Sequence, residues 1–292
     1  GNVPTGEIPP EDEIYYVNQP VTLAEEPSHE GYVFKGWDRA DGFRMPNSPV
    51  EITGTWEVDF SDITAGKIME IYSGETYTIP LDGILSGDQA EFFVNGEKVD
   101  NSFKDVTDQT VTVRITRGTD VFEENIAVRI DPRTVLLKSA DRTERYTGNE
   151  YDMPELVEET GWVESEKVNI AYDFTGKQKW VGKSDNTFTA VSTNNEKVKL
   201  ANYNIQYEYG ILTVTDGSTE EPIGPDGVVT KTHDDREYRR GDTITFTITA
   251  VNIYNEAKTI TITEQAGVTI TGDSVFENVQ PGDMVETTAT YE

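Results

Sequence analysis

The chain has 292 residues and is strongly acidic, with 24 Lys and Arg against 54 Asp and Glu and a formal net charge of −30. It contains two histidines and no cysteine, which excludes disulfide scaffolds, thiolate metal sites and cysteine nucleophiles. The charge also excludes a broad basic surface for nucleic acid. Aromatic residues make up 10% of the chain, a content that suits small β-sheet cores.

No membrane-spanning or targeting segment is visible in the sequence. The longest uncharged apolar runs, such as residues 248–251, fall far short of the ~20 residues that a membrane helix needs. Residues 1–4 show neither the basic nor the apolar region of a signal peptide. The lack of cysteine fits a secreted protein that does not rely on disulfides, but it fits a cytosolic protein as well. We therefore expect no membrane insertion, and composition leaves the compartment open.

Alternation of apolar and polar residues dominates the chain. Residues 110–116, 243–249 and 259–263 repeat every two positions, with Thr at most of the polar places. This period predicts half-buried strands with Thr facing water, and dipeptides such as Asn95-Gly96 supply the turns between them. Only residues 154–159 have a spacing that predicts a short helix.

Turn-rich and proline-rich segments predict four modules in tandem. A Pro- and Glu-rich leader, residues 1–11, precedes modules at 12–58, 59–133, 134–216 and 217–292, and a Gly/Pro/Glu linker at 216–227 precedes the last. With the leader counted in the first, the four segments carry net charges of −8, −8, −5 and −9. Because the acidity is spread along the whole chain, it indicates solubility and mutual repulsion along an extended rod rather than a localised acidic tail.

The sequence offers no catalytic constellation. His29 and His233 lie in different modules and in strongly polar surroundings, without a second histidine nearby for a metal pair. We interpret both as solvated loop residues. No nucleophile-elbow, zinc-protease, P-loop or dinucleotide-binding motif is present. We therefore predict that the chain is not an enzyme, and we assign no catalytic, cofactor-binding or metal-binding residue.

Adjacent carboxylates are frequent and could in principle supply a glycosidase dyad. They occur at residues 123–124, 158–159, 220–221 and 234–235. With 54 acidic residues, such pairs are expected by chance. Catalytic carboxylates also need a concave pocket, for which modules this small leave little room.

Two alternatives to a plain polar surface stay open. Calcium suits the acidic turns because carboxylate and carbonyl oxygens are its preferred ligands. The nearest segments are residues 82–88 and 216–226, although neither has the spacing of a calcium-binding loop. A lysine–asparagine isopeptide cross-link is the second alternative, and Lys231 with Asn278 is the pair that spans most of the last module.

The four tryptophans also have two interpretations. They could line a glycan-binding platform, but in a module this small a tryptophan more often fills the core, burying up to about 250 Å². We therefore predict core positions for Trp37, Trp56, Trp162 and Trp180.

The first module carries short motifs in a specific order, namely GYVFKGW at 31–37, FRMP at 43–46 and VEITGTW at 50–56. This order resembles the short repeats of Gram-positive surface proteins, of the internalin B-repeat and streptococcal tandem-repeat kind, over residues 12–58. The resemblance implies a small β-grasp-like sheet whose core would include Phe34, Trp37 and Trp56.

The third module runs through VLLKSA at 135–140, YTGN at 146–149, VGKSDNTF at 181–188, ANYNI at 201–205 and GILTVT at 210–215. This succession resembles the MBG-type β-rich repeat of bacterial surface proteins over the whole module. The second module is similar to a divergent copy of the same unit, with IYSGE at 71–75 and VTDQTVTV at 106–113.

The last module resembles the Ig-like repeat that recurs in bacterial surface and adhesin chains. It carries GDTITFTI at 241–248 and QPGD at 280–283, before TTATY at 287–291. None of these families brings catalytic residues that could be transferred to this chain.

Together the patterns predict an all-β chain of tandem small β-sandwich and β-grasp-like domains, arranged as an elongated rod. The resemblances imply a non-catalytic, monomeric stalk of a secreted, wall-attached bacterial surface protein that projects or supports an adhesive region. A binding module for a host extracellular protein or a glycan is the alternative, and an accessory region of a carbohydrate-active enzyme is a third. We expect no cofactor, apart from the open question of calcium, and no nucleic-acid partner.

Overall fold

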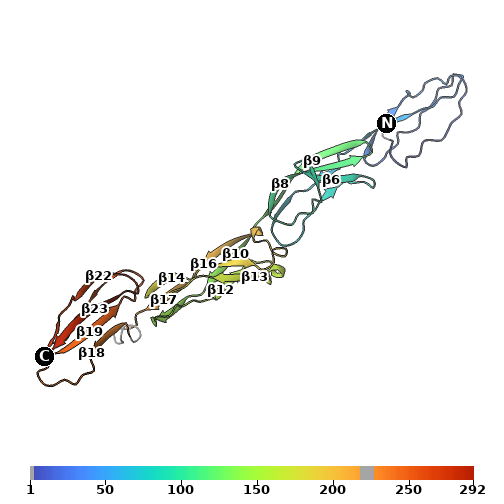
Figure 1. The fold of residues 1–292 in the computed structure, drawn as a ribbon. Helices are drawn as coiled ribbons and strands as arrows, with labels where there is room; N and C mark the ends of the chain where they lie inside the picture. Colours follow the sequence, from blue (N-terminus) through green and yellow to red (C-terminus); the bar gives the residue numbers. More distant parts are fainter. Residues whose placement is uncertain (1–2, 218–226) are drawn as a thin grey trace. The chain divides into compact units, whose positions relative to one another are not determined.

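The computed structural model describes residues 3–217 and 227–292, and its regular secondary structure is almost entirely β-strand (Figure 1). Besides the strands, the described residues contain one short helix, α1 (Glu164–Lys167), and one 3-10 turn, Leu200–Asn202. The predicted all-β fold is therefore confirmed. Within the described ranges, no helix has the length and apolar character that crossing a membrane would require.

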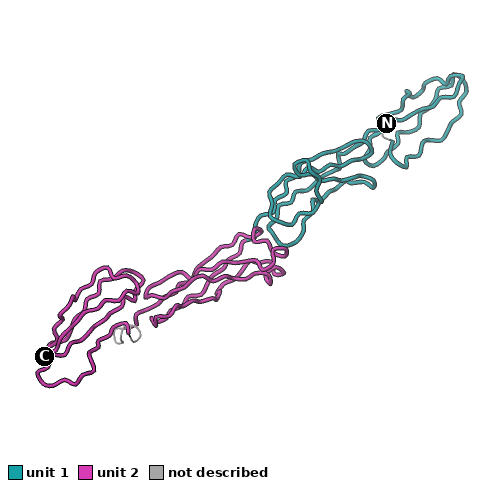
Figure 2. The backbone as a smooth tube through the Cα atoms, viewed as in Figure 1, with its two compact units in different colours: residues 1–133 teal, residues 134–292 magenta. Residues whose placement is uncertain are grey.

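The chain forms two compact units, residues 1–133 and residues 134–292 (Figure 2). Each unit consists of several small sheets rather than one large one. The finer division of each unit into two modules stays a prediction.

The strands of unit 1 are β1 (Tyr32–Trp37), β2 (Gly54–Val58), β3 (Thr64–Ala65), β4 (Ile68–Ile71), β5 (Leu81–Asp82), β6 (Gln89–Val94), β7 (Glu97–Val99), β8 (Thr107–Arg117) and β9 (Asp120–Asp131). β1 pairs with β2 and β3 pairs with β5, both antiparallel. The largest sheet has the order β4-β9-β8-β6-β7. Its pairings are antiparallel except that of β4 with β9, which is parallel.

The core of unit 1 lies against the long hairpin of β8 and β9. Val111, Val113 and Ile115 alternate along β8 and are fully buried, while Thr112 and Arg114 between them remain more exposed. Val128 and Ile130 continue the same buried face on β9. The strand predicted at 110–116 is therefore confirmed, since one face of the hairpin packs and the other meets water.

The strands of unit 2 are β10 (Arg133–Ser139), β11 (Arg142–Arg145), β12 (Leu156–Thr160), β13 (Ile170–Phe174), β14 (Gly182–Asp185), β15 (Phe188–Ser192), β16 (Tyr203–Glu208), β17 (Ile211–Thr215), β18 (Val229–His233), β19 (Ile244–Val251), β20 (Lys258–Thr261), β21 (Val268–Ile270), β22 (Val275–Val279) and β23 (Met284–Tyr291). β10 begins at the last residue of unit 1. The sheet orders are β12-β10-β16, β11-β17-β14, β13-β15, β18-β19-β23-β21 and β20-β22.

Unit 2 has buried residues in both of its halves. Leu137 and Leu212 are buried among the strands before residue 217, and Ile248 and Ala289 are buried between the sheets after residue 227. β19 and β20 confirm the strands predicted at 243–249 and, with a shorter extent, at 259–263.

The helix predicted at residues 154–159 is wrong. That segment forms β12, which pairs antiparallel with β10. Its apolar spacing covers little more than one helical turn, too short to hold a helix on its own, so pairing with a neighbouring strand decides its conformation. The single α-helical turn of the described residues lies a few residues later, at α1.

Candidate functional site

β4 and β9 lie side by side in the large sheet of unit 1, of which they are the first and last strands in chain order, and they run in the same direction. Ile68 pairs with Val128 at one end of the contact, and Ile71 pairs with Asp131 at the other. The N–H of Tyr72 extends the ladder by donating to the carbonyl of Asp131 at 2.9 Å. Ile68 and Tyr72 are buried, so backbone hydrogen bonds and apolar packing hold this strand pair together.

Unit 2 contains the same arrangement between β11 and β17. These strands are also parallel, with Arg142 opposite Leu212 and Arg145 opposite Thr215. The N–H of Tyr146 donates to the carbonyl of Thr215 at 2.8 Å. The Tyr146 ring is buried as well, and this burial raises its pKa. We call the β4–β9 and β11–β17 contacts the two parallel clamps.

A tyrosine hydroxyl closes the turn that follows the first strand of each clamp. In unit 1 the Tyr77 hydroxyl lies 2.8 Å from the Ser73 hydroxyl and donates to the carbonyl of Ile71 at 3.3 Å. In unit 2 the Tyr151 hydroxyl lies 2.6 Å from the Thr147 hydroxyl and donates to the carbonyl of Arg145 at 3.1 Å. Gly74 and Gly148 take positive φ angles of 81° and 85° inside these turns, a conformation that favours glycine.

An asparagine amide fixes the chain after each turn. Asn101 donates to the carbonyl of Ile79 at 3.0 Å, and Asn186 donates to the carbonyl of Met153 at 2.8 Å. Ile79 and Met153 are 74 residues apart, as are Tyr72 and Tyr146, and as are Tyr77 and Tyr151. The segments 72–79 and 146–153 thus make matching hydrogen bonds.

The direction of the clamp strands determines how they respond to tension. When two parallel strands are pulled from the start of one and the end of the other, the force acts along both strands. The hydrogen bonds between them are spaced evenly along the pair, and they bear the load together because the force acts across all of them at once. An antiparallel hairpin pulled at its open end would instead lose its bonds one after another. This arrangement can therefore resist extension without any catalytic chemistry.

A buried arginine in unit 1 connects the large sheet with the β1–β2 pair. Arg117, the last residue of β8, binds Asp88 through Nε at 3.0 Å and Nη2 at 2.8 Å, and both side chains are almost fully buried. Nη1 donates to the carbonyls of Asp59 at 2.6 Å and Gly31 at 3.3 Å, and Nη2 also donates to that of Gly83 at 3.1 Å. One side chain thus connects the end of β8 with the chain on both sides of the β1–β2 pair.

In unit 2 a backbone bridge joins the segment before β14 to the segment after β19. The N–H of Val181 donates to the carbonyl of Ile253 at 2.8 Å, and the N–H of Asn255 donates to the carbonyl of Val181 at 3.0 Å. Val181 and Ile253 share a buried apolar cluster with Tyr146, Val214 and Val228. The end of the β11–β17 clamp therefore packs directly against the last part of the chain.

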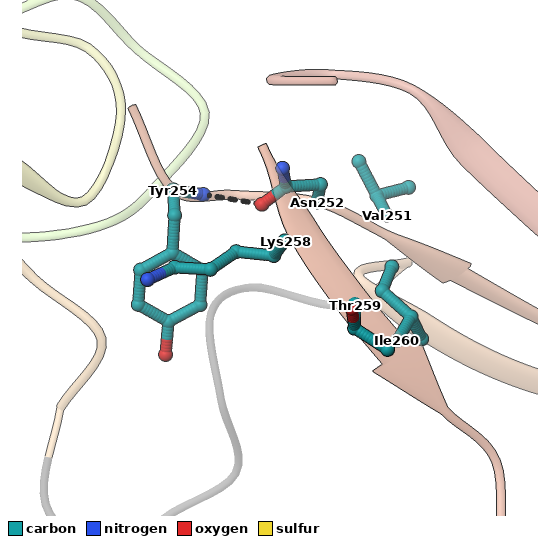
Figure 3. Close-up of a pocket in the computed structure, with 6 residues that line it drawn as sticks. All are labelled: Val251, Asn252, Tyr254, Lys258, Thr259 and Ile260. Atoms are coloured by element: carbon teal, nitrogen blue, oxygen red, sulfur yellow. Dashed lines mark hydrogen bonds between the residues drawn. The ribbon is translucent and has the colours of Figure 1, made fainter. Parts of the chain in front are cut away.

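A small pocket lies beside this bridge (Figure 3). The figure shows the Lys258 side chain extended along the ring of Tyr254. The backbone N–H of Tyr254 donates to Asn252 Oδ1 at 3.0 Å. The Tyr254 hydroxyl donates to Asp216 at 2.6 Å. This bond, together with burial and the negative charge of Asp216, raises the pKa of Tyr254 to about 12. These contacts are structural links rather than a ready acid–base pair.

The two histidines lie in different surroundings. His29 is half-buried rather than solvated, because its Nδ1 lies 3.1 Å from Glu7 and its ring contacts Tyr32 and Trp56. His233 is exposed, but it ends strand β18 rather than lying in a loop.

The tryptophans divide into two groups. Trp56 and Trp162 are 5% and 7% exposed, so their predicted core positions are confirmed. Trp37 is half-buried and donates from its indole to the carbonyl of Ala24 at 3.0 Å. Trp180 is half-buried against the apolar cluster of unit 2 and stacks on Tyr146.

The adjacent carboxylates found in the sequence have other partners. Glu123 accepts a hydrogen bond from Arg114 at 2.6 Å, and Glu159 accepts one from Tyr172 at 2.5 Å. Asp234 accepts from Tyr238. The pair at 220–221 lies outside the described residues. Each described pair thus has a member already bound by an arginine or a tyrosine.

The segments considered for calcium do not form an ion site in the described structure. In the segment 82–88, Asp88 is bound to Arg117. Most of the segment 216–226, like most of the linker at 216–227, lies outside the described residues, and Asp216 accepts from Tyr254. Over residues 3–217 and 227–292, no group of three His, Asp or Glu side chains is arranged to hold a metal ion.

The pair considered for an isopeptide bond is also engaged elsewhere. Lys231 Nζ lies 2.6 Å from Glu264 and 4.4 Å from the centre of the Phe246 ring. Asn278 accepts hydrogen bonds from Gln280 through both its backbone and its side-chain oxygen. The described contacts therefore do not join Lys231 to Asn278.

Comparisons with known proteins add little to this description. No family model matches the chain, and no curated protein matches it at a significant level. Among solved structures the chain is similar to the crystal structure of Drosophila N-cadherin EC1-3, at 10% sequence identity and a TM-score of 0.18, with 92% of each chain covered. A likeness at this level carries no argument about function.

Proposed function

We propose that this chain is a load-bearing stalk segment of a secreted, wall-attached bacterial surface protein, projecting or supporting an adhesive region. The observation that carries the proposal is the recurrence of the parallel clamp, β4–β9 in unit 1 and β11–β17 in unit 2. A contact that loads its hydrogen bonds together suits a chain held under tension. The resemblance of the modules to repeats of Gram-positive surface proteins supports the secreted, wall-attached location.

The connections within each unit support the same proposal. Arg117 binds the chain on both sides of the β1–β2 pair, and the Val181 bridge joins two parts of unit 2. Such links limit bending inside a unit, which a spacer needs in order to transmit force. No catalytic step is part of the proposal.

Single-molecule force spectroscopy tests the proposal with two matched variants in β4. Because the N–H of Tyr72 points to β9, the alternation along the strand directs the N–H of Glu70 to β9 as well and that of Met69 away from it. Glu70→Pro removes a clamp hydrogen bond, whereas Met69→Pro places the same residue where the clamp needs no donor.

We expect the force that unfolds unit 1 to fall in Glu70→Pro and to change much less in Met69→Pro, when the full chain is pulled from its two ends. Equal unfolding forces in the wild type and both variants would show that the clamp does not bear the load. The stalk proposal would then lose its mechanical basis.

A further inference from the structure

A groove of about 600 Å³ lies in unit 1 between residues 9–15 and the loops that flank β1 and β2. Residues 9–13 and Tyr15 form one side, and residues 21–24, 43, 45 and 49–52 form the other together with Trp37. Its volume falls within the range of about 300–1,000 Å³ that small-ligand and peptide-anchor sites occupy. The groove belongs neither to the parallel clamps nor to the Arg117 connection.

The floor and one wall of the groove are apolar and held in place. Val21 is buried, and Trp37, Phe43 and Met45 are half-buried along the groove. The Trp37 indole is fixed by its hydrogen bond to the carbonyl of Ala24, and its ring packs edge-on against Phe34 at 4.9 Å between centres. A wall anchored in this way does not need to rearrange before it receives a ligand.

The rim of the groove is acidic. Glu11, Asp12, Glu13 and Glu51 line it and are exposed, and no Lys or Arg is among its lining residues. Three of these carboxylates lie in the segment 11–13, which is attached to the rest of the unit through Tyr15. The Tyr15 hydroxyl donates to Glu13 at 2.5 Å and accepts from the N–H of Thr22 at 3.3 Å.

Several apolar side chains next to Tyr15 in the chain are exposed to solvent. Ile14, Tyr16 and Val17 are 98%, 85% and 60% exposed, and they flank Tyr15, which lines the groove. Ile14, Tyr16 and Val17 do not themselves line the groove, but neighbouring exposed apolar residues mark an interaction surface more often than isolated ones do. This surface thus combines apolar contact area with a negative rim.

We propose that the groove binds a Lys- or Arg-containing peptide segment of a partner protein. The cationic heads would meet the acidic rim, and the apolar side chains of the peptide would lie on the wall and on Ile14, Tyr16 and Val17. Charge complementarity selects this occupant, because an anionic partner would be repelled and a neutral glycan would leave the rim carboxylates without counter-charges. The aromatic wall adds affinity for a cation, as the Arg39 guanidinium over the ring of Phe43 at 5.8 Å already illustrates.

Fluorescence anisotropy with a defined probe tests the proposal on the full chain. The probe is a fluorescein-labelled peptide of alternating Arg and Leu, and its counterpart with Glu in place of Arg is the control ligand. The groove variant combines Glu11→Gln, Asp12→Asn and Glu51→Gln. The matched variant combines Glu25→Gln, Glu26→Gln and Glu30→Gln, which changes the charge of the same module equally at exposed positions that do not line the groove.

We expect the groove variant to weaken binding of the Arg peptide about tenfold and the matched variant to weaken it less than about twofold, with the Glu peptide not bound. Val50→Thr in the groove wall should weaken binding, and Val33→Thr, at an exposed position on β1, should not. Equal losses in the two charge variants would assign the binding to the general acidity of the chain and overturn the proposal. Absence of Arg-peptide binding, or displacement of the peptide by a neutral oligosaccharide, would overturn it as well.

Discussion

Arg117 holds Asp88 by two hydrogen bonds of 2.8 and 3.0 Å in a site where both side chains are almost fully buried. The same guanidinium donates to the carbonyls of Asp59, Gly31 and Gly83. Removing one partner of a buried ion pair leaves the other charge uncompensated, so this contact is a sensitive point of unit 1.

The first prediction concerns the stability that depends on this pair. Arg117→Leu should lower the free energy of unfolding of unit 1 by about 3–5 kcal/mol, measured by urea denaturation of the full chain. Arg114→Leu is the control, since Arg114 lies on the same strand but forms an exposed pair with Glu123 worth about 1 kcal/mol or less. The double variant with Asp88→Asn should recover part of the loss, because no unpaired charge remains. Similar costs for Arg117→Leu and Arg114→Leu would contradict this account.

The second prediction concerns pH. Burial alone would raise the pKa of Asp88, but the hydrogen bonds from Arg117 and from the N–H of Leu85, with the charge of Arg117, outweigh it and hold the pKa below its ordinary value of 3.8. A carboxylate with a depressed pKa in the folded state stabilises the fold above its unfolded pKa and loses this contribution as pH falls through the lowered value.

The free energy of unfolding of the wild type should therefore exceed that of Asp88→Asn by a constant amount at neutral pH. The difference should shrink once the pH falls below 3.8. A difference that stays unchanged into this acidic range would show that the charge of Asp88 is not what stabilises the site.

The third prediction compares two glycines with nearly the same backbone angle. Gly31 and Gly42 have φ angles of 75° and 76°, so alanine pays a similar conformational cost at each. A Cβ at Gly31 would lie 2.4 Å from Arg117 Nη1 and 2.5 Å from Leu85 Cδ1, whereas a Cβ at Gly42 meets nothing within 4 Å. We expect Gly31→Ala to destabilise unit 1 by about 1–3 kcal/mol more than Gly42→Ala in thermal or urea unfolding. Equal losses would mean that Arg117 moves away without cost.

The fourth prediction concerns Tyr254 in unit 2. Its hydrogen bond to Asp216, with burial and the Asp216 charge, raises its pKa from 10.0 to about 12. A raised pKa means that the neutral tyrosine stabilises the fold fully below pH 10, and that this contribution is lost as the pH rises through about 12. Tyrosinate absorbance of the wild type minus that of Tyr254→Phe should show one hydroxyl titrating near that higher value. Titration of this hydroxyl near 10 would contradict the bond to Asp216.

Much of the strand pattern was accessible from the sequence, because alternation alone places Val111, Val113 and Ile115 on one face of β8. Arg117 occupies the next position of that same alternating series, so the pattern places it on the buried face. Its charge, however, would normally suggest an exposed position. Its partner could not be found in this way, since Asp88 comes from a turn whose position depends on the tertiary fold. The interpretation of His29 as solvated failed for a similar reason, because Glu7 is brought to it from the leader.

The motifs around the clamps can be recognised in the sequence, but the strand pairings that they form cannot. The Tyr-x-Gly segments at Tyr72 and Tyr146 are visible in the sequence. The strand next to each of these segments pairs in parallel with residues 60 positions later in unit 1 and 70 positions later in unit 2. Such pairing requires the whole module to fold first. The incorrect helix at 154–159 shows the same limit, because β10 supplies hydrogen bonds that local spacing does not reveal.

Because β4 and β9 run in the same direction, as do β11 and β17, further modules of this kind can be added to a chain one after another. The polypeptide enters the first strand of each clamp at one end of its sheet and leaves the last strand at the opposite end. A duplicated copy of such a module can therefore be inserted in series, in the same polarity, without the chain having to turn back on itself.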